Sequence, residues 1–254
     1  MDMDISIVMT YYNRKHQLLN TLRSIKHDVE IIIVDDGSRE EHDIKDLSNG
    51  NIKVITLKDK TWINPCIAFN TGFANATGDV IIIQNAECIH IGDIVSHVRR
   101  FAKNTLYLNY SAYSINEQLT HRIIEGEEVL SVIEPLEQRC VPANGENGWY
   151  NHPVYRPHMA HFCSAITRKD LYDLGGFDER FYDGLGFDDN DLLTRIQKKN
   201  MTIRMIENPF VVHQWHEVHF TDNITPYMEL NCRRWEAGKL QKYYNVRPYN
   251  TIFK

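Results

Sequence analysis

ISIVMTYYNR, residues 5–14, is a short, largely β-branched apolar run that ends abruptly in polar side chains. Three further runs of the same kind follow it, namely IIIV at 31–34, IKVITL at 52–57 and VIII at 80–83. Strands that are covered on both faces in a parallel sheet have this nearly continuous apolar character. The four runs therefore predict buried parallel strands.

Helical patterns lie between these strands. Residues 16–26 place Leu18, Leu22 and Ile25 on one stripe, and residues 65–76 repeat small and apolar side chains at helical spacing. Alternation of strand and helix at this rhythm is typical of an α/β fold rather than of a sandwich or a bundle. The first half of the chain thus predicts a layered α/β sheet.

The second half is less regular. We expect helices at 92–101, 125–137, 167–174, 189–199 and 225–240, with strands at 105–113, 202–206 and 210–212. The stretch PANGENGWYNHPVYRPH, residues 142–158, is rich in turn formers and aromatic side chains and predicts an ordered, irregular loop with a functional role. Because no repeat or linker divides the chain, one domain is expected.

Composition bounds the class of protein. The 254 residues are 43% hydrophobic with a net charge of −6, which excludes a disordered chain and argues against a nucleic-acid-binding module. The five cysteines are widely spaced without a C-x-x-C pair, so neither a disulfide framework nor a thiolate zinc site is expected. Without a signal peptide pattern or an apolar stretch of membrane-spanning length, we expect a soluble, cytoplasmic protein.

Polar residues follow the first two strands. Thr10 to Arg14 (TYYNR) come after the first, and Asp35 to Ser38 (DDGS) after the second. Ligands of open parallel sheets bind beyond the carboxyl ends of the strands. A carboxylate such as Asp36 can accept from a base or a ribose hydroxyl, and a tyrosine ring can stack on a base. The alternative is that Asp-Gly-Ser is only a turn.

Candidate metal ligands lie at two places. Asn85 and Glu87 project to the same side of an extended segment after the fourth strand, as hard oxygen ligands for Mg²⁺ or Mn²⁺ against a diphosphate. His213 and His216 follow a later strand and are also suitable ligands. The alternatives are a polar strand end without a ligand and histidines that are packed or on the surface.

An acidic run precedes the apolar pattern at 189–199. Asp188, Asp189 and Asp191 place three carboxylates within four positions. Their mutual repulsion raises at least one pKa, which suits a general base. The same residues can instead form the N-terminal cap of a helix, with acids matched to its dipole.

Taken together, the chain resembles the GT-A glycosyltransferases, in particular inverting family 2, over roughly residues 4–220. Five motifs occur in the family order, namely IVMTYYNR at 7–14, VDDGS at 34–38, NTG at 70–72 with ATGD at 76–79, NAE at 85–87, and GGFDE at 175–179 with the acidic run after Gly186. That run is also similar to the Gly-Glu-Asp-Asp-Asp segment of galactosyltransferases and chondroitin-type polymerases, in which a histidine after the next strand completes the metal site.

The resemblance implies a GT-A fold, a three-layer α/β/α arrangement around a mostly parallel, mixed sheet. It implies a single domain over residues 1–254. Residues 1–100 would be a Rossmann-like half that binds the nucleotide sugar, residues 101–220 the acceptor-binding half, and residues 221–254 a C-terminal helix and tail.

The resemblance also implies roles for single residues. Thr10, Tyr12, Asp36 and Asn70 would hold the nucleoside, a uridine. Glu87 and His213 would bind Mn²⁺ or Mg²⁺ at the diphosphate, with Asn85 adjacent and His216 as the alternative ligand. Asp189 would be the base that activates a hydroxyl of a glycan or other acceptor for a single inverting displacement on the sugar of a UDP-sugar. Asp188 would orient the acceptor, and Trp149 and Tyr150 would stack on sugar faces.

Two positions depart from the family pattern. Asn-x-Glu at 85–87 replaces Asp-x-Asp, so one anionic ligand is missing, and Phe69 stands where many relatives carry an arginine before Asn-x-Gly. The first departure motivates an alternative, a nucleotide-sugar or glycan-binding protein that has lost turnover. A sugar nucleotidyltransferase is a third class, but the Tyr-Tyr-Asn loop after the first strand lacks the glycine-rich, basic sequence that such an enzyme favours.

Overall fold

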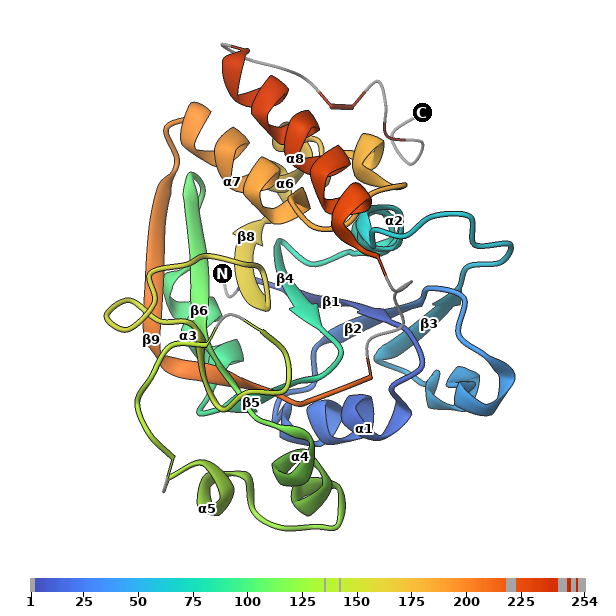
Figure 1. The fold of residues 1–254 in the computed structure, drawn as a ribbon, viewed down its shortest axis with the longest axis vertical. Coiled ribbons are helices and arrows are strands. Elements are labelled where there is room, and N and C mark those ends of the chain that lie inside the picture. The colour runs from blue at the N-terminus through green and yellow to red at the C-terminus, as the bar shows by residue number, and fades with distance from the viewer. Residues whose placement is uncertain are drawn as a thin grey trace.

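The computed structural model describes residues 3–134, 136–141, 143–217, 223–241, 246–247 and 250. In these residues one mixed sheet lies between two layers of helices (Figure 1). The strands are β1 (Ile5–Tyr11), β2 (Glu30–Asp35), β3 (Ile52–Thr56), β4 (Val80–Asn85), β5 (Cys88–Ile91), β6 (Leu106–Ser114), β7 (Gly148–Asn151), β8 (Cys163–Thr167) and β9 (Thr202–His213). The helices are α1 (Lys15–Ser24), α2 (Cys66–Asn75), α3 (Ile94–Phe101), α4 (Glu117–Ile124), α5 (Val129–Ile133), α6 (Arg168–Leu174), α7 (Asp188–Lys198) and α8 (Thr225–Leu240).

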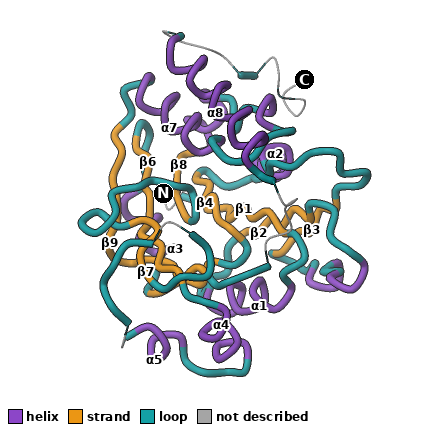
Figure 2. The backbone as a smooth tube through the Cα atoms, in the orientation of Figure 1, coloured by secondary structure: helices purple, strands orange, loops and turns teal. Residues whose placement is uncertain are grey.

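The sheet has the order β3-β2-β1-β4-β8-β6-β9-β5, and β7 pairs with β6. The strands β3, β2, β1 and β4 are parallel to one another, whereas β8 runs antiparallel to both β4 and β6. The four apolar runs in the first half of the sequence therefore form the parallel half of the sheet, as predicted. Figure 2 shows how the strands continue from this half into the longer β6 and β9.

The helices cover both faces of the sheet and confirm the predicted α/β/α layers. On one face Leu18 of α1 and Val98 of α3 belong to the buried cluster that includes Ile7 and Met9. The opposite face is covered by α2, α6 and α7, whose apolar side chains pack on Val8 and neighbouring strand residues. The alternating side-chain directions of the parallel strands separate these two clusters.

The helix α2 packs unusually close to the sheet at Gly72. A Cβ atom on this residue would lie 2.3 Å from Val8 Cγ1 and 3.2 Å from Val34 Cγ2. Only glycine permits this approach. The close packing sets the position of α2 against β1 and β2, whose carboxyl ends border the site described below.

Some elements differ from the sequence predictions. The single helix predicted over 125–137 is wrong: the chain forms α4 and the short α5, separated by Gly126 with a φ of +106°. Asn116, whose side chain accepts from Leu119 N, begins α4. The strands β5, β7 and β8 are not predicted by any apolar run, because their sequences, CIHI, GWYN and CSAIT, contain polar or small residues between the apolar ones. The two predicted strands at 202–206 and 210–212 are one strand, β9.

The C-terminal part of the described chain contains α8 at the predicted residues. Most of the polar tail predicted after it lies outside the described residues. In the part of the chain that the structure describes, no helix has the length and apolar character needed to cross a membrane.

Candidate active site

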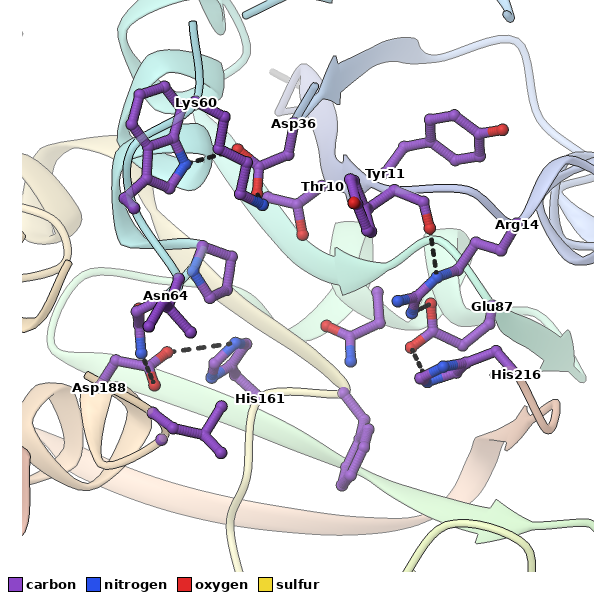
Figure 3. Close-up of a pocket in the computed structure, with 18 of the residues that line it drawn as sticks. Thr10, Tyr11, Arg14, Asp36, Lys60, Asn64, Glu87, His161, Asp188 and His216 are labelled. Carbon is purple, nitrogen blue, oxygen red and sulfur yellow. Dashed lines mark hydrogen bonds and ion pairs between the residues drawn. The ribbon is translucent and has the colours of Figure 1, made fainter. Parts of the chain in front are cut away.

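A cavity of about 780 Å³ opens where β1, β2 and β4 end. The strand ends supply Thr10 to Arg14, Asp36 and the segment from Asn85 to Glu87. The segment after β3, the loop before β8, the start of α7, the segment after β9 and the start of α8 supply the rest of the described lining, namely Lys60, Trp62, Ile63, Asn64, Pro65, His161, Phe162, Leu185, Gly186, Asp188, His216, Glu217, Ile224 and Tyr227. Figure 3 shows polar side chains grouped around the cavity: Asp36 with Lys60, Glu87 with Arg14 and His216, and Asp188 with Asn64 and His161.

The first group surrounds Asp36. Its carboxylate lies 2.5 Å from Lys60 Nζ and accepts a hydrogen bond of 2.7 Å from Trp62 Nε1. Lys60 Nζ also lies 4.6 Å from the centre of the Tyr12 ring. Burial raises the pKa of Asp36 although Lys60 and Trp62 act to lower it. Thr10 and Tyr12 line the same wall, so three predicted nucleoside-binding residues lie together.

Asn70, the fourth residue of that predicted set, lies elsewhere. It is fully buried in α2, where its side-chain amide donates to Phe177 O at 2.8 Å and to Glu179 Oε1 at 3.0 Å. Its Oδ1 accepts from Phe177 N at 2.9 Å. Asn70 therefore ties the GGFDE segment to α2 and is absent from the described lining of the cavity.

The second group consists of Glu87, His213 and His216. His213 Nε2 and His216 Nε2 lie 3.3 and 3.7 Å from Glu87 Oε1, and the potential ligand atoms of the three residues are all within 4.8 Å of one another. The antiparallel pairing of Cys88 with His213 brings these distant segments together. Gln214, which is fully buried, fixes the junction by donating from N and Nε2 to Glu87 O at 3.1 and 3.0 Å.

The pKa shifts of Glu87 and His216 suit a set of metal ligands. Burial acts to raise the pKa of Glu87, but Arg14 and the two histidines hold that pKa well below its usual range. Arg14 Nη1 lies 2.7 Å from Glu87 Oε2. Burial and Arg14 lower the pKa of His216 to about 4, so its imidazole is neutral at pH 7. The neutral imidazole of His216 and the ionised carboxylate of Glu87 are suitable ligands for a divalent transition metal.

In addition, one potential ligand atom of this group has no hydrogen-bond partner among the described residues. This atom is His213 Nδ1, which is buried. Asn85, predicted as an adjacent ligand, lines the cavity at the end of β4. The residues present therefore fit a divalent cation, in spite of the departure from Asp-x-Asp.

The third group lies at the start of α7. Asp188 Oδ1 accepts a hydrogen bond of 2.8 Å from Asn64 Nδ2, and Asp188 Oδ2 lies 4.0 Å from His161 Nε2. Asp189 Oδ2 faces the other imidazole nitrogen, His161 Nδ1, at 3.9 Å. Asp188 lines the cavity, whereas Asp189 is not among the described residues that do so.

The three acidic residues at the start of α7 make different contacts. Asp191 forms a buried ion pair of 2.8 Å with Arg195, which donates to the carbonyl groups of Leu174 and Gly176. That contact is structural. The helix α7 has no side-chain cap hydrogen bond. Phe187, the residue before it, has a φ of 66°, a backbone conformation that residues other than glycine rarely adopt. This sharp entry directs Asp188 into the cavity.

The pKa of Asp188 is raised by its burial and by the charge of Asp189. His161 and the hydrogen bond from Asn64 act in the opposite direction. The repulsion that the acidic sequence predicts is therefore present between Asp188 and Asp189. Phe69, at the position of the expected arginine, packs edge-on against His161 with ring centres 5.2 Å apart.

Neither predicted sugar-stacking residue lines the cavity. Trp149 is 6% exposed, donates from Nε1 to Gln138 Oε1 at 2.7 Å and packs on Tyr113 and Phe210. Tyr150 stacks on Phe162 and lies edge-on to His213. It thus contacts the second group, Glu87, His213 and His216, which is called the metal-ligand group below. The loop at 142–158 contains β7, whose pairing with β6 takes both rings into the core, so stacking on a sugar is not proposed for them.

Sequence reasoning did not assign roles to Arg14, Lys60, Trp62, Asn64 and His161. Four of the five could have been suspected: Arg14 lies in the first motif, and the segment from Lys60 to Asn64 follows the third predicted strand, at the same edge of the sheet. His161 precedes β8, a strand that the sequence did not indicate, so no pattern placed it at the cavity.

An α/β/α fold with these groups beyond the strand ends defines the GT-A class of glycosyltransferases. The chain belongs to glycosyl transferase family 2, whose model matches residues 6–172. A second family, described as the N-terminal domain of galactosyltransferase, matches residues 151–218, which include the acidic run and His213.

Individual relatives agree with this assignment. The chain is 24% identical over 222 residues to a pre-mycofactocin glycosyltransferase of Mycobacterium tuberculosis, which covers 86% of this chain and 44% of that protein. The fold is similar to that of GalNAc-T7, with a TM-score of 0.62 and 18% identity over 88% of this chain and 45% of that one. The mannosyltransferase PcManGT of Pyrobaculum calidifontis has a TM-score of 0.55 and 14% identity over 100% of this chain and 68% of that one. The chain spans less than half the length of the curated relative.

Proposed function

We propose that the chain transfers a sugar from a nucleoside-diphosphate sugar, a UDP-sugar, to a hydroxyl group of a glycan or other acceptor, with inversion at the anomeric carbon. The observation that carries the proposal is that one cavity borders the Asp36 group, the candidate metal ligands Glu87 and His216, and Asp188, next to which Asp189 lies at the start of α7. The solved structure of GalNAc-T7 contains UDP, GalNAc and Mn²⁺, and that of PcManGT contains GDP-Man and Mn²⁺, which supports this class of donor.

The Asp36 group suits a nucleoside. Its carboxylate can accept from a base N–H or a ribose hydroxyl, and the Tyr12 ring, which lines the same wall, offers an apolar face for stacking. Lys60 and Trp62 hold the carboxylate in one orientation. Thr10, at the end of β1, provides a hydroxyl between this group and the metal-ligand group.

Glu87, His213 and His216 would hold a divalent cation beside Asn85. A cation bound there would offset the negative charge that develops on the departing nucleoside diphosphate. Arg14 lines this end of the cavity and pairs with Glu87 at 2.7 Å, so its own charge is largely balanced.

Asp189 acts as the general base in this proposal. Asp188 is held by Asn64 and has 7% of its side chain exposed, whereas Asp189 has 21% exposed and is the more accessible carboxylate. Asp189 takes the proton of the acceptor hydroxyl as that oxygen bonds to the anomeric carbon. The bond from this carbon to the phosphate oxygen breaks at the same time, and its electron pair leaves with the diphosphate. Asp188 orients the acceptor.

A panel of nucleotide sugars tests the activity. We expect release of UDP from one or more UDP-sugars in the presence of Mn²⁺ and a set of glycan acceptors, and inverted anomeric configuration of the product by NMR. UDP binding without turnover of any donor would favour the binding-protein alternative. Formation of a nucleotide sugar from UTP and a sugar 1-phosphate would favour the nucleotidyltransferase.

The base assignment predicts a selective loss of kcat. Asp189→Asn keeps the size of the side chain and removes its basicity, so we expect kcat to fall roughly 10²- to 10⁴-fold while UDP affinity stays near that of the wild type. Asp188→Asn should change the acceptor KM more than kcat. The control is Asp173→Asn, an exposed acid on α6. If Asp189→Asn turns over normally and Asp188→Asn does not, Asp188 is the base.

A further inference from the structure

His161 occupies a position that the mechanism above does not use. Its ring is held between aromatic side chains, with centres 5.2 Å from Phe69 and 4.9 Å from Phe177. It lies at the cavity wall, beside the carboxylates of α7. Packing of this kind fixes the plane of the imidazole, so each ring nitrogen points in a defined direction.

Each nitrogen of His161 faces a different carboxylate. Nε2 lies 4.0 Å from Asp188 Oδ2, and Nδ1 lies 3.9 Å from Asp189 Oδ2. Both distances are within reach of an ion pair and beyond that of a hydrogen bond. Nδ1 is buried and has no hydrogen-bond partner among the described residues.

An unpaired nitrogen in this environment is unfavourable, because a buried polar group without a partner has lost its hydrogen bonds to water and gained none in return. A shift of less than about 1 Å by either carboxylate would bring it within hydrogen-bond distance. His161 also acts, together with the hydrogen bond from Asn64, to lower the pKa of Asp188, which burial and the charge of Asp189 raise overall. The imidazole is thus placed to act on both carboxylates at once.

We infer that His161 is a positioning residue of the transfer, which bridges Asp188 and Asp189 and holds their carboxylates in the orientation that the acceptor hydroxyl requires. The inference rests on the proposed function, because the carboxylates have this use only in a transferase. Phe69 and Phe177 fix the ring, and the ring in turn fixes the two acids.

Two substitutions separate positioning from packing. His161→Phe keeps a ring against Phe69 and removes both nitrogens, and His161→Gln keeps one polar group in reach of Asp188. With the UDP-sugar that the donor panel identifies, we expect both to lower kcat roughly 10- to 100-fold, with the larger loss in His161→Phe. Affinity for UDP with Mn²⁺, measured by calorimetry, should stay within about threefold, since donor groups are untouched. The matched control is His121→Gln on α4, where the side chain is 60% exposed.

A kcat of His161→Phe within twofold of the wild type would overturn the inference. Equal losses of kcat and of UDP affinity together with a lower melting temperature would also overturn it, because they indicate a packing role alone.

An NMR experiment tests the bridge without turnover. The imidazole nitrogens of His161, identified by the loss of their signals in His161→Phe, should change chemical shift at fixed pH in both Asp188→Asn and Asp189→Asn. Asp173→Asn should leave them unchanged. If no donor is turned over, the proposed function fails, but these shifts still decide the bridge: their presence supports it, and unchanged signals in both variants overturn it.

Discussion

Asp36 and Asp188 are both buried carboxylates of the cavity, and their partners give them different properties. Asp36 has a lysine ammonium group and an indole N–H as partners. Asp188 has the neutral amide of Asn64 and a second carboxylate, Asp189, nearby. The first arrangement holds a hydrogen-bond acceptor in place, and the second keeps two mutually repelling acids beside each other at the edge of the cavity.

Substitution of Asp36 tests its role toward the nucleoside. We expect Asp36→Ala to raise the Kd for UDP roughly 10- to 150-fold, because a lost hydrogen bond to a charged group is worth about 1.5–3 kcal/mol. Calorimetric titration with UDP and Mn²⁺ measures this effect. Asp28→Ala, at an exposed position, is the control. An unchanged Kd would show that residues 35–38 are only a turn.

The raised pKa of Asp188 predicts a dependence of stability on pH. Between the ordinary value of 3.8 and the raised one, the folded chain binds more protons at Asp188 than the unfolded chain does. The free energy of unfolding therefore falls as the pH rises through this window, and the loss remains at neutral pH. Asp188→Asn can still accept from Asn64 and removes this loss. We expect a higher melting temperature than that of the wild type at pH 7 and no gain near pH 3, by calorimetry. A lower melting temperature at pH 7 would contradict the prediction.

The sequence predicted the location of some residues of the site and not of others. Thr10, Asp36 and Glu87 follow apolar runs, so the end of a predicted strand placed them at the cavity. Trp149 has the kind of aromatic side chain that stacks on sugars. Its strand pairing in β7 and its hydrogen bond to Gln138 instead place the ring in the core. Local sequence cannot distinguish these outcomes, because the same side chain suits either environment.

At the scale of elements, pairing register brings the metal-ligand group together. Cys88 of β5 pairs with His213 of β9, although 125 residues separate them, and Glu87 precedes the first of these. A register shift of one residue would turn His213 to the other face of the sheet. The sequence predicted the ligand types, and the β5–β9 pairing decided that they meet.

Asn70 joins the helix α2 to the GGFDE segment. We therefore expect a substitution of Asn70 to affect the stability of the fold and not nucleotide binding. Asn70→Ala would leave the N–H group of Phe177 without its acceptor, at about 1–3 kcal/mol for a buried group, whereas the C=O group of Phe177 keeps Asn250 Nδ2 as a donor at 2.7 Å. We expect a lower free energy of unfolding in urea and an unchanged Kd for UDP. Asn75→Ala, at a half-buried position at the C-terminal end of the same helix, is the control. A selective loss of UDP affinity would restore the nucleotide-binding role that the sequence predicts for Asn70.

At the scale of the molecule, the net charge of −6 opposes an anionic donor. Arg14 and Lys60 line the cavity, but each is paired with a carboxylate, Glu87 or Asp36. The protein cations at the site are thus largely balanced. A nucleoside diphosphate in this cavity requires further positive charge, which a divalent cation at Glu87, His213 and His216 would supply.

This charge balance predicts that UDP stabilises the fold only with a divalent cation. UDP at 100 times its Kd adds about 2.7 kcal/mol to the free energy of unfolding, or roughly 5–10 °C in melting temperature. We expect this shift with Mn²⁺ and none with EDTA. Glu87→Gln and His213→Ala should each abolish most of it, and His27→Ala, beside Asp93, should not. Equal shifts with and without Mn²⁺ would remove the metal from the proposal.

The sequence by itself determined the parallel half of the sheet, the helices that flank it and the family, because apolar periodicity and strand-end motifs are local properties that survive without the rest of the chain. The tertiary structure decided which further polar residues join Thr10, Asp36 and Glu87 at the cavity. His161 meets Asp188 and Asp189, and Lys60 meets Asp36, through contacts between segments that are far apart in the chain. The contacts of His161 depend on how the segment before β8 packs against the start of α7, and a pattern within a single segment carries no information about them.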